Sequence, residues 1–183
     1  AMMFIMVPRA AVSADRIAEV LATQPSVMDD EHPDTFGGRP QGKVEFRDVS
    51  FRYQNAESDV LEHISFTALP GQTTAFIGST GSGKSTLINL IPRFYDPTRG
   101  KILIDGKDIR HLSQHELRQY IGYVPQKGIL FSGDISSNLR YGDQEATDEQ
   151  LKLAADIAQA TDFIEATEGG FHNDISQGGS NVS

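Results

Sequence analysis

A nine-residue run from Gly78 to Thr86 limits the fold of this chain more than any other segment. It matches the pattern G-x-x-x-x-G-K-[ST], with Gly78, Gly83, Lys84 and Ser85 at the fixed places. A loop that wraps phosphate groups must turn tightly and bring backbone N–H groups close to oxygen, so it needs glycine where a Cβ would clash. The residues expected to surround phosphate are Gly78, Ser79, Thr80, Gly81, Ser82, Gly83, Lys84, Ser85 and Thr86.

The segments on either side of this loop favour the same interpretation. Residues Gln72–Ile77 have the pattern of a buried strand that follows the turn Pro70-Gly71. Residues Thr86–Ile91 have the pattern of a helix that ends at Pro92. A Gly/Ser-rich surface loop is the alternative, but strand, glycine loop and helix in this order predict an α/β protein with a phosphate site.

The loop also predicts how phosphate would be held. The helix that follows it directs the positive end of its dipole at an anion. Lys84 can place a point charge on the β and γ phosphates of a nucleotide, and the hydroxyl of Ser85 can bind Mg²⁺.

Composition excludes several other classes of function. The 183 residues contain no cysteine, which rules out disulfides and thiolate metal sites within them. A net charge of −9 without a Lys/Arg cluster argues against a primary role in nucleic-acid binding. The apolar opening Ala1–Val7 is too short to span a bilayer and lacks the basic leader of a signal peptide. It is either a sequence added for expression or the end of a longer apolar helix.

The N-terminal part divides into a helix and a linker. Ala10, Ala14, Ile17 and Leu21 recur at helical spacing, which predicts a helix over these residues. Residues 23–42 are rich in Pro and Gly and carry an acidic run, so we expect a solvated linker there.

Strand patterns follow the linker, and helical patterns dominate near the C-terminus. The expected strands are Lys43–Arg47, Leu61–Ala68, Lys101–Ile104 and Ile121–Val124. The alternation of the first strand shifts at Asp48 and continues to Tyr53, and the third strand ends at the turn Asp105-Gly106. Capping-box spacing at Ser113–Glu116 predicts a helix to Tyr120, and the same spacing at Thr147–Gln150 predicts another. The Gly/Ser-rich tail from Ser176 is expected to form neither helix nor strand.

Several motifs occur in an order that is typical of one family. They are the aromatic stretch Val49–Tyr53, the loop Gly78–Thr86, and the segments Phe94–Gly100, Tyr123–Gln126, Leu130–Ile135 and Ser176–Ser183. Together they resemble the nucleotide-binding domain of an ATP-binding cassette (ABC) exporter, in which membrane helices and ATPase are fused in one polypeptide. Residues Pro8–Leu21 are similar to the exit of the last transmembrane helix of such exporters.

The resemblance implies a fold and a domain organisation. The fold would be a P-loop NTPase of ABC type, with a β-rich ATP-binding core and an α-helical subdomain, incomplete at the C-terminus. Residues 1–22 would be the cytoplasmic end of the last transmembrane helix, and residues 23–42 a linker. Residues 43–125 would form the ATP-binding core, and residues 126–183 the helical subdomain up to the signature motif.

The resemblance also implies cofactors, partners and site residues. ATP and Mg²⁺ would be bound, with Tyr53 stacking on adenine and Gln126 accepting Mg²⁺ or positioning the attacking water. Tyr53 could instead be only the end of a strand, and Gln126 only a loop residue after Pro125. The partners would be a second nucleotide-binding domain, identical or different, and the coupling helices of a transmembrane domain at the cytoplasmic face of the cell membrane. Gln177 resembles an exporter segment near those helices, or belongs to a flexible tail.

One departure from the family pattern affects catalysis. Ser183 matches the first residue of the family signature Ser-Gly-Gly-Gln, and the Mg²⁺-ordering aspartate, catalytic glutamate and switch histidine have no counterpart in these residues. We therefore expect this chain alone to bind ATP without hydrolysing it at a family-like rate. Surface or local hydrogen-bonding roles are expected for His32, His63, His111, His115 and His172, and helix capping or solvated faces for Glu116, Glu145 and Glu149.

Two rival functions differ from the exporter interpretation. A P-loop kinase or GTPase is one, but a GTPase needs an Asn-Lys-x-Asp base reader, and the sequence contains none. A non-catalytic module that uses ATP as a switch is the other, and it fits the missing catalytic residues.

Overall fold

The computed structural model of the chain describes residues 2–179 and residue 181. Packing divides it into two units, residues 1–122 and residues 123–183, which are described separately below. The sequence interpretation put this division after Pro125 rather than after Gly122.

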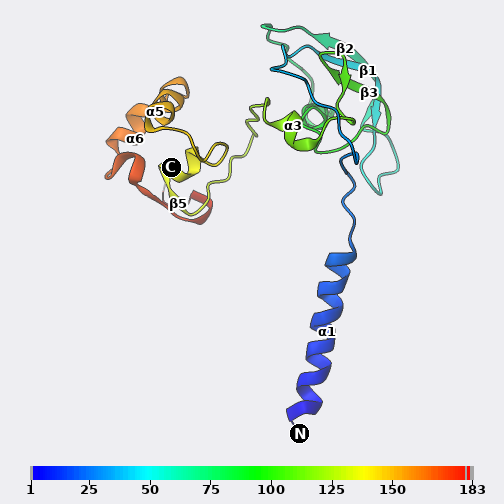
Figure 1. Ribbon diagram of the computed structural model, residues 1–183, viewed down its shortest axis with the longest axis vertical. Coiled ribbons are helices and arrows are strands. Elements are labelled where there is room, and N and C mark those ends of the chain that lie inside the picture. Colours follow the sequence, from blue (N-terminus) through cyan, green and yellow to red (C-terminus); the bar gives the residue numbers. More distant parts are fainter. Residues whose placement is uncertain (1, 180, 182–183) are drawn as a thin grey trace. The chain divides into compact units, whose positions relative to one another are not determined.

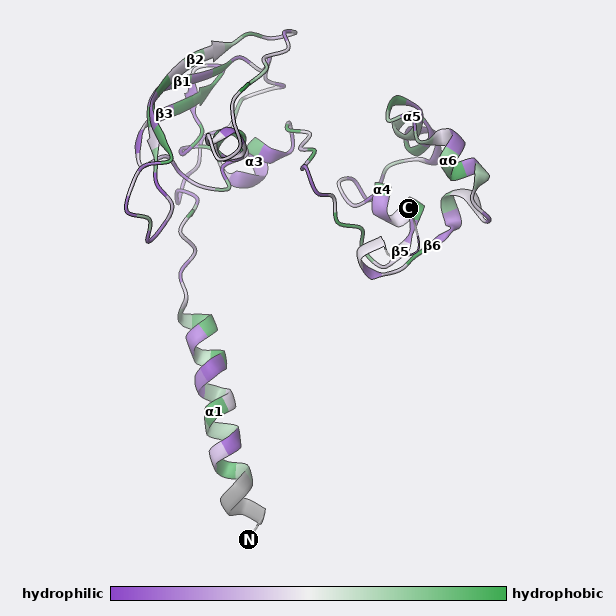
Figure 2. Ribbon diagram, turned by 180° about the vertical axis from the view of Figure 1, so that it is seen from behind, coloured by the Kyte–Doolittle hydropathy of each residue, from purple (hydrophilic) through white to green (hydrophobic). Residues whose placement is uncertain are grey.

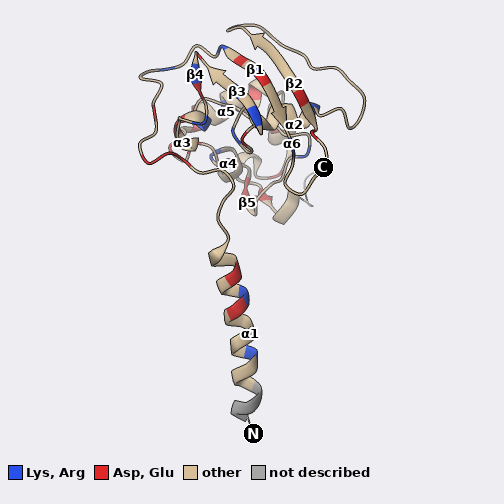
Figure 3. Ribbon diagram, turned by 90° about the vertical axis from the view of Figure 1, so that its right-hand side faces the viewer, with Lys and Arg blue, Asp and Glu red and all other residues tan. Residues whose placement is uncertain are grey.

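The first unit opens with one long helix, α1 (Met2–Ala22), which includes Pro8. It is longer at both ends than the helix predicted from Ala10 to Leu21. The side chains described on it, from Met6 onward, are exposed, and apolar and polar residues alternate along it (Figure 2). Charges of both signs lie on the half nearer to the sheet (Figure 3). Among the residues that the structure describes, no helix has the length and apolar character needed to cross a bilayer.

An antiparallel sheet forms the body of the first unit (Figure 1). Its strands are β1 (Val44–Phe51), β2 (Leu61–Ala68), β3 (Arg99–Ile104) and β4 (Lys107–Asp108), in the order β2-β1-β3-β4. Central strand β1 pairs with both neighbours, so that Phe46 lies opposite Phe66 on one side and Ile102 on the other. The rings of Phe46 and Phe66 stack with centroids 4.5 Å apart.

The predicted shift of the alternation at Asp48 is a β-bulge. Pairing of β1 with β2 slips between Phe46 and Val49, and Asp48 has a φ of 53°. Gly100 on β3 faces this bulge with a φ of +77°, and a Cβ there would lie 2.2 Å from the backbone oxygen of Asp48. A bulge bends the strand, and here only glycine allows the two backbones to approach so closely.

Two short helices complete the core of the first unit. They are α2 (Lys84–Leu90) and α3 (Gln114–Arg118). Each differs by a few residues from its prediction, because α2 already begins at Lys84 and α3 ends before Tyr120. The apolar residues buried together are Phe46, Val49, Phe51, Leu61, Leu87, Leu90, Ile102, Ile104, Ile109, Leu112 and Leu117.

Two predicted strands are wrong. Residues 72–77 and 121–124 have no regular secondary structure, and Ile77 and Val124 are 96% and 93% exposed. An apolar run forms a buried strand only when neighbouring strands take up its backbone N–H and C=O groups. In the part of the chain that the structure describes, neither segment belongs to a sheet ladder.

The second unit is built from short elements around a small apolar cluster. Its elements are β5 (Gly133–Asp134), α4 (Ile135–Leu139), α5 (Asp148–Ile157), α6 (Thr161–Ala166), the 3-10 turn η1 (Gly170–His172), β6 (Asp174–Ile175) and the 3-10 turn η2 (Gln177–Gly179). The cluster consists of Ile135, Ala155, Ile164 and Ile175. The predicted capping box at Thr147 is present, with both reciprocal hydrogen bonds formed.

The tail of the second unit is more ordered than its composition suggested. Gln177–Gly179 forms the turn η2, where the N–H of Gly178 donates to the backbone oxygen of Leu130 at 3.0 Å. This long-range contact is the reason why a Gly/Ser-rich segment adopts a defined turn. Of the predicted signature approach, Ser180, Val182 and Ser183 lie outside the described residues.

Candidate nucleotide-binding site

The loop from Gly78 to Gly83 leads directly into α2, as the motif predicted. Gly81 and Gly83 have φ values of +82° and +85°, and Gly83 is the N-cap of α2 in the left-handed conformation. The N–H of Leu87 donates to the oxygen of Gly83 at 2.9 Å, which closes the first turn of the helix. The free N–H groups of a first helical turn therefore lie at the end of the loop, where they can donate to an anion.

Added side chains would crowd two fixed glycines of the motif, more severely at Gly83 than at Gly78, where only the movable hydroxyl of Ser82 is close. A Cβ on Gly83 would lie 2.8 Å from Cδ2 of Leu61 and 3.2 Å from the oxygen of Val60. A Cβ on Gly78 would lie 2.7 Å from Oγ of Ser82. The loop is thus packed against the start of β2, and its curvature depends on the absence of side chains at these positions.

The side chain of Lys84 is folded over the loop. Its Nζ donates to the backbone oxygens of Gly78 at 2.8 Å and Ser79 at 2.6 Å, and to Oγ of Ser82 at 3.2 Å. The cation therefore lies at the centre of the curve that the backbone makes. Backbone N–H groups, one ammonium and the exposed hydroxyl of Ser85 form a donor set that fits a polyphosphate with a bound divalent ion.

Tyr53 lies next to the phosphate loop in space, although 33 residues separate it from Thr86. The hydroxyls of Tyr53 and buried Thr86 are hydrogen-bonded at 2.9 Å. The ring of Tyr53 packs edge-on against Phe51, with centroids 4.8 Å apart, and against Tyr95 at 5.3 Å. The structure thus brings together the residue predicted to stack on a base and the loop predicted to hold phosphate.

The sequence analysis gave no role to two features beside Tyr53. Tyr95 packs on it, and the carboxylate of Asp59 accepts from Arg52 and from Arg99, both at 2.7 Å. The hydrogen bond from Arg52 is the main reason why the pKa of Asp59 lies below its ordinary value. Tyr95 lay within a recognised segment, but nothing in the spacing indicated that Asp59 would join two strand ends.

Gln126 and Ser85 belong to different units, so their shared role toward Mg²⁺ stays a prediction. Gln126 is an exposed residue of the second unit, and Ser85 is an exposed residue at the start of α2 in the first. Among the described residues, no group of three or more Asp, Glu or His side chains has the arrangement of a metal site.

Glu116 has a different role from the one predicted. Ser113 caps α3 by accepting from the N–H of Glu116 at 3.1 Å, but the carboxylate of Glu116 does not complete the capping box. It accepts instead from the backbone N–H of Phe36 at 3.0 Å and from the side chain of Gln119 at 2.7 Å. The carboxylate of Glu116 thus binds a backbone group 80 residues away in the sequence instead of capping its own helix.

The histidines take local roles, as predicted. His63, His111 and His172 each lie beside a carboxylate, at 2.7 Å from Asp48, 3.0 Å from Asp30 and 3.5 Å from Asp134. His32 and His115 are exposed.

Known proteins are similar to this chain over most of its length. Residues 61–181 match the family model described as "ABC transporter". An uncharacterized ABC transporter ATP-binding protein of Bacillus subtilis (strain 168), YfiB, is 42% identical over 175 residues, which are 96% of this chain and 30% of YfiB. NdvA of Rhodopseudomonas palustris (strain BisB5), named a beta-(1-->2)glucan export ATP-binding/permease protein, is 46% identical over 176 residues, which are 94% of this chain and 29% of NdvA.

A solved structure gives the same result. The structure of a bacterial Atm1-family ABC exporter with ATP bound superposes with a TM-score of 0.87 and 32% sequence identity, covering 100% of this chain and 32% of that one. The chain thus spans about a third or less of the length of these relatives. These matches show that the chain belongs to the ABC transporter family, as an ATPase domain of the exporter type.

Proposed function

We propose that the chain is the ATP-binding part of an exporter that couples the binding and hydrolysis of ATP to movement of a substrate across a membrane. The hydrogen bond between Tyr53 and Thr86 carries this proposal, because it joins a base-stacking ring to the phosphate loop. NdvA is named for glucan export and YheH of Bacillus subtilis (strain 168) for multidrug resistance, so relatives of similar identity differ in cargo. The cargo of this protein is therefore left open.

The proposal gives each site residue a role. The loop N–H groups from Gly78 to Thr86 and the ammonium of Lys84 hold the phosphates. Tyr53 stacks on adenine, an interaction of about 1–3 kcal/mol by analogy with base–aromatic stacking. Ser85 and Gln126 would hold Mg²⁺, which neutralises charge on the phosphate oxygens when bound. Gln126 also positions the attacking water.

The proposed partners are a second nucleotide-binding domain and the coupling helices of a transmembrane domain. An exposed aromatic pair in the second unit suits the coupling helices. Phe131 and Tyr141 are 49% and 70% exposed, and their rings stack at 4.6 Å. Exposed aromatic groups of this kind supply the apolar centre of protein interfaces. The proposed location is the cytoplasmic face of the cell membrane.

Isothermal titration of the intact protein with ATP and Mg²⁺ tests the proposed site. Replacing Lys84 by Ala should weaken binding at least tenfold, which corresponds to about 1.4 kcal/mol. Lys101→Ala, an exposed lysine on β3, is the matched control and should leave affinity unchanged. Equal affinities of Lys84→Ala and wild type would refute the site.

Two variants of Tyr53 test the proposed stacking on the adenine base. Tyr53→Ala should cost about 1–3 kcal/mol of ATP binding, and Tyr53→Trp should cost little, because stacking needs only a π-face. ATP and GTP should then differ modestly. A strong preference for GTP would favour the rival GTPase class, and an unaffected alanine variant would remove the stacking role.

We also propose that residues 1–183 alone bind ATP without hydrolysing it at a family-like rate. Carboxylates near the site already hold structural partners, since Asp59 binds two arginines and Asp96 binds Arg93. Steady-state phosphate release from this chain, beside that from the intact protein, is the measurement. Intact protein that binds ATP but releases no phosphate would point to the non-catalytic switch.

A further inference from the structure

Residues Met28–Lys43, which we term the strap, contain most of the segment 23–42 that was expected to be a solvated linker, together with Lys43, which was expected to open the first strand. The structure instead fixes them along the segment from Asp105 to Tyr120 (Figure 1). The contacts begin at its first residue and continue to its last. They are formed by backbone groups and side chains of the strap with groups between Arg93 and Tyr120, which is an arrangement that composition cannot reveal.

Arg93 holds the N-terminal end of the strap. Its side chain is only 3% exposed, and its Nη2 donates to the backbone oxygen of Met28 at 2.8 Å. Its Nη1 donates to the backbone oxygen of Leu112 at 3.0 Å, and its Nε to Asp96 at 2.9 Å. One buried guanidinium thus joins the strap, the segment after α2 and the segment before α3, and uses its planar fork of donors to do so.

The acidic run, which was expected to be only solvated, adds to this attachment. Asp29 lies 3.5 Å from Nη1 of Arg93, and its carboxylate accepts from the backbone N–H of Gln114 at 3.0 Å. Asp30 lies 3.0 Å from Nδ1 of His111, and the N–H of Asp34 donates to the backbone oxygen of His111 at 2.7 Å. Asp29 and Asp30 are exposed, as expected, but their attachment was not predicted because the partners lie about eighty residues along the chain.

An aromatic side chain anchors the middle of the strap. Phe36 packs against the core of the first unit, and its ring meets that of Tyr120 edge-on with centroids 5.6 Å apart. The backbone N–H of Phe36 donates to Glu116, as described above. Apolar burial and a charge-assisted hydrogen bond therefore act at the same residue.

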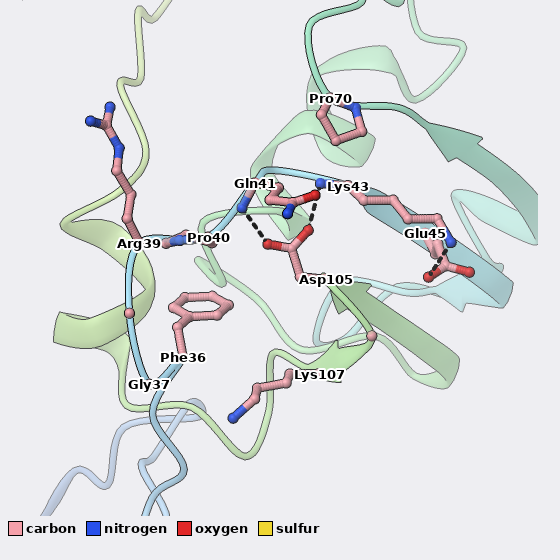
Figure 4. A pocket seen from close by; sticks show the side chains of 12 residues that line it. Phe36, Gly37, Arg39, Pro40, Gln41, Lys43, Glu45, Pro70, Asp105 and Lys107 are labelled. Atoms are coloured by element: carbon pink, nitrogen blue, oxygen red, sulfur yellow. Dashed lines mark hydrogen bonds and ion pairs between the residues drawn. The ribbon is translucent and has the colours of Figure 1, made fainter.

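The C-terminal end of the strap is held by Asp105, which lies in the turn between β3 and β4. Its carboxylate accepts from the backbone N–H groups of Gln41 at 2.6 Å, Gly42 at 3.3 Å and Lys43 at 2.9 Å. Figure 4 shows this carboxylate hydrogen-bonded to the strap, and both line a pocket of about 690 Å³ to which Phe36 also belongs. The turn that joins two strands is thereby also a clamp on the strap.

These contacts leave little free chain between α1 and the core. Thr23 continues the end of α1, with its hydroxyl donating to the oxygen of Glu19 at 3.0 Å. Residues 24–27 alone separate it from Met28. We propose that Arg93 locks the strap to the nucleotide-binding core, so that movement of the core reaches α1 through residues 24–27 rather than through a slack linker of residues 23–42. The consequence for transport rests on the proposed function, but the lock itself does not.

Hydrogen–deuterium exchange of the intact protein tests the lock. In Arg93→Met, which keeps the length of the side chain without its donors, exchange of strap amides should accelerate at least tenfold. Arg110→Met removes an arginine that pairs with Asp108 in the same unit and should leave the strap protected. Asp29→Ala removes the contacts on the exposed side of the strap and should accelerate exchange to a smaller extent. This variant tests the proposal even if Arg93→Met does not fold.

A distance measurement adds a readout that loss of stability alone does not change. Spin labels are placed on α1 and β2 through Val20→Cys and Glu62→Cys, both exposed residues. The distance distribution between them should be narrow in the parent and in Arg110→Met, and clearly broader in Arg93→Met and Asp29→Ala. Equal protection and equal widths in all variants would overturn the lock. If the parent protein does not bind ATP but its strap amides are protected from exchange, the proposed function is refuted and the proposed attachment of the strap by Arg93 is not.

Discussion

The two units of this chain are each stabilised internally in a different way. In the first, eleven buried apolar residues form one cluster, and side chains join segments more than sixty residues apart, as Arg93 does with Met28. In the second, four buried residues form the cluster, and most side-chain hydrogen bonds are local. Asn138, for example, bonds to Phe131 and Asp134, seven and four residues before it.

This difference teaches where sensitivity to substitution should lie. A residue in a large, closely packed core removes many contacts when it is truncated, whereas a small cluster has fewer contacts to lose. Long-range ties also make distant segments unfold together, while local caps stabilise only their own helix. Substitutions in the first unit should therefore destabilise it strongly and affect distant segments. Substitutions in the second unit should have smaller effects on stability that are limited to nearby residues.

The largest expected effect comes from truncating the two cores. Phe46→Ala should destabilise the first unit by about 3–5 kcal/mol, because the buried ring leaves a cavity between β2 and β3. Ile164→Ala should cost about 2 kcal/mol, because its neighbourhood already contains a cavity of about 160 Å³. Urea unfolding followed by hydrogen exchange of each unit gives both values. Equal costs would contradict the comparison.

A smaller effect is expected when one glycine in each unit is replaced by alanine. Gly100→Ala should cost at least about 2 kcal/mol, because its Cβ would meet the backbone oxygen of Asp48 at 2.2 Å in a left-handed conformation. Gly142→Ala in the second unit meets nothing within 4 Å and should change stability by less than about 0.5 kcal/mol. Thermal unfolding of both variants is the measurement, and a harmless Gly100→Ala would mean that the bulge can relax.

The local caps of the second unit should matter less. Asp134 caps α4 by accepting from the N–H of Ser137 at 2.6 Å, and Asp134→Ala should cost about 1 kcal/mol at neutral pH. Asp134→Asn keeps the cap and should be nearly neutral.

The same cap gives a pH dependence. The hydrogen bond from the Ser137 N–H holds the pKa of Asp134 below its ordinary value. Its contribution is therefore present above the unfolded pKa near 4 and is lost as pH falls through the folded value. The difference between Asp134→Ala and wild type should shrink in acid, and a difference that is constant with pH would contradict this account.

The smallest effect concerns His111, which ties the strap to the first unit. Its hydrogen bond with Asp30 raises the pKa of His111, with a further contribution from the charge of Asp108. The contact should therefore be fully present below the ordinary histidine pKa of about 6.5 and be lost as pH rises through the folded value. After correction for intrinsic rates, strap amides should exchange slightly faster at alkaline pH, and His111→Ala should abolish this dependence. If the pH dependence of strap exchange persists in His111→Ala, a group other than His111 causes it.

Local sequence was enough to predict the features that depend on backbone conformation and short spacing. Gly81 and Gly83 have the left-handed φ values that favour glycine, a side chain at Gly83 would also crowd Leu61 and Val60, and the shift at Asp48 marks a real bulge. The cap at Thr147 forms in full because both of its partners lie within one helical turn. The family followed from the order of the motifs, and comparison with known proteins confirmed it.

Only the tertiary structure decided which distant groups meet. Residues 72–77 and 121–124 have sequence patterns typical of buried strands, but a strand also needs a paired neighbour, which the pattern does not reveal. The strap read as a linker because Pro, Gly and acidic residues favour solvent, yet Arg93 and Asp105 bind its backbone from far along the chain. Short-range preferences are written in the sequence, whereas long-range hydrogen bonds depend on how the chain folds back on itself, and these fixed the strap and joined Tyr53 to the phosphate loop.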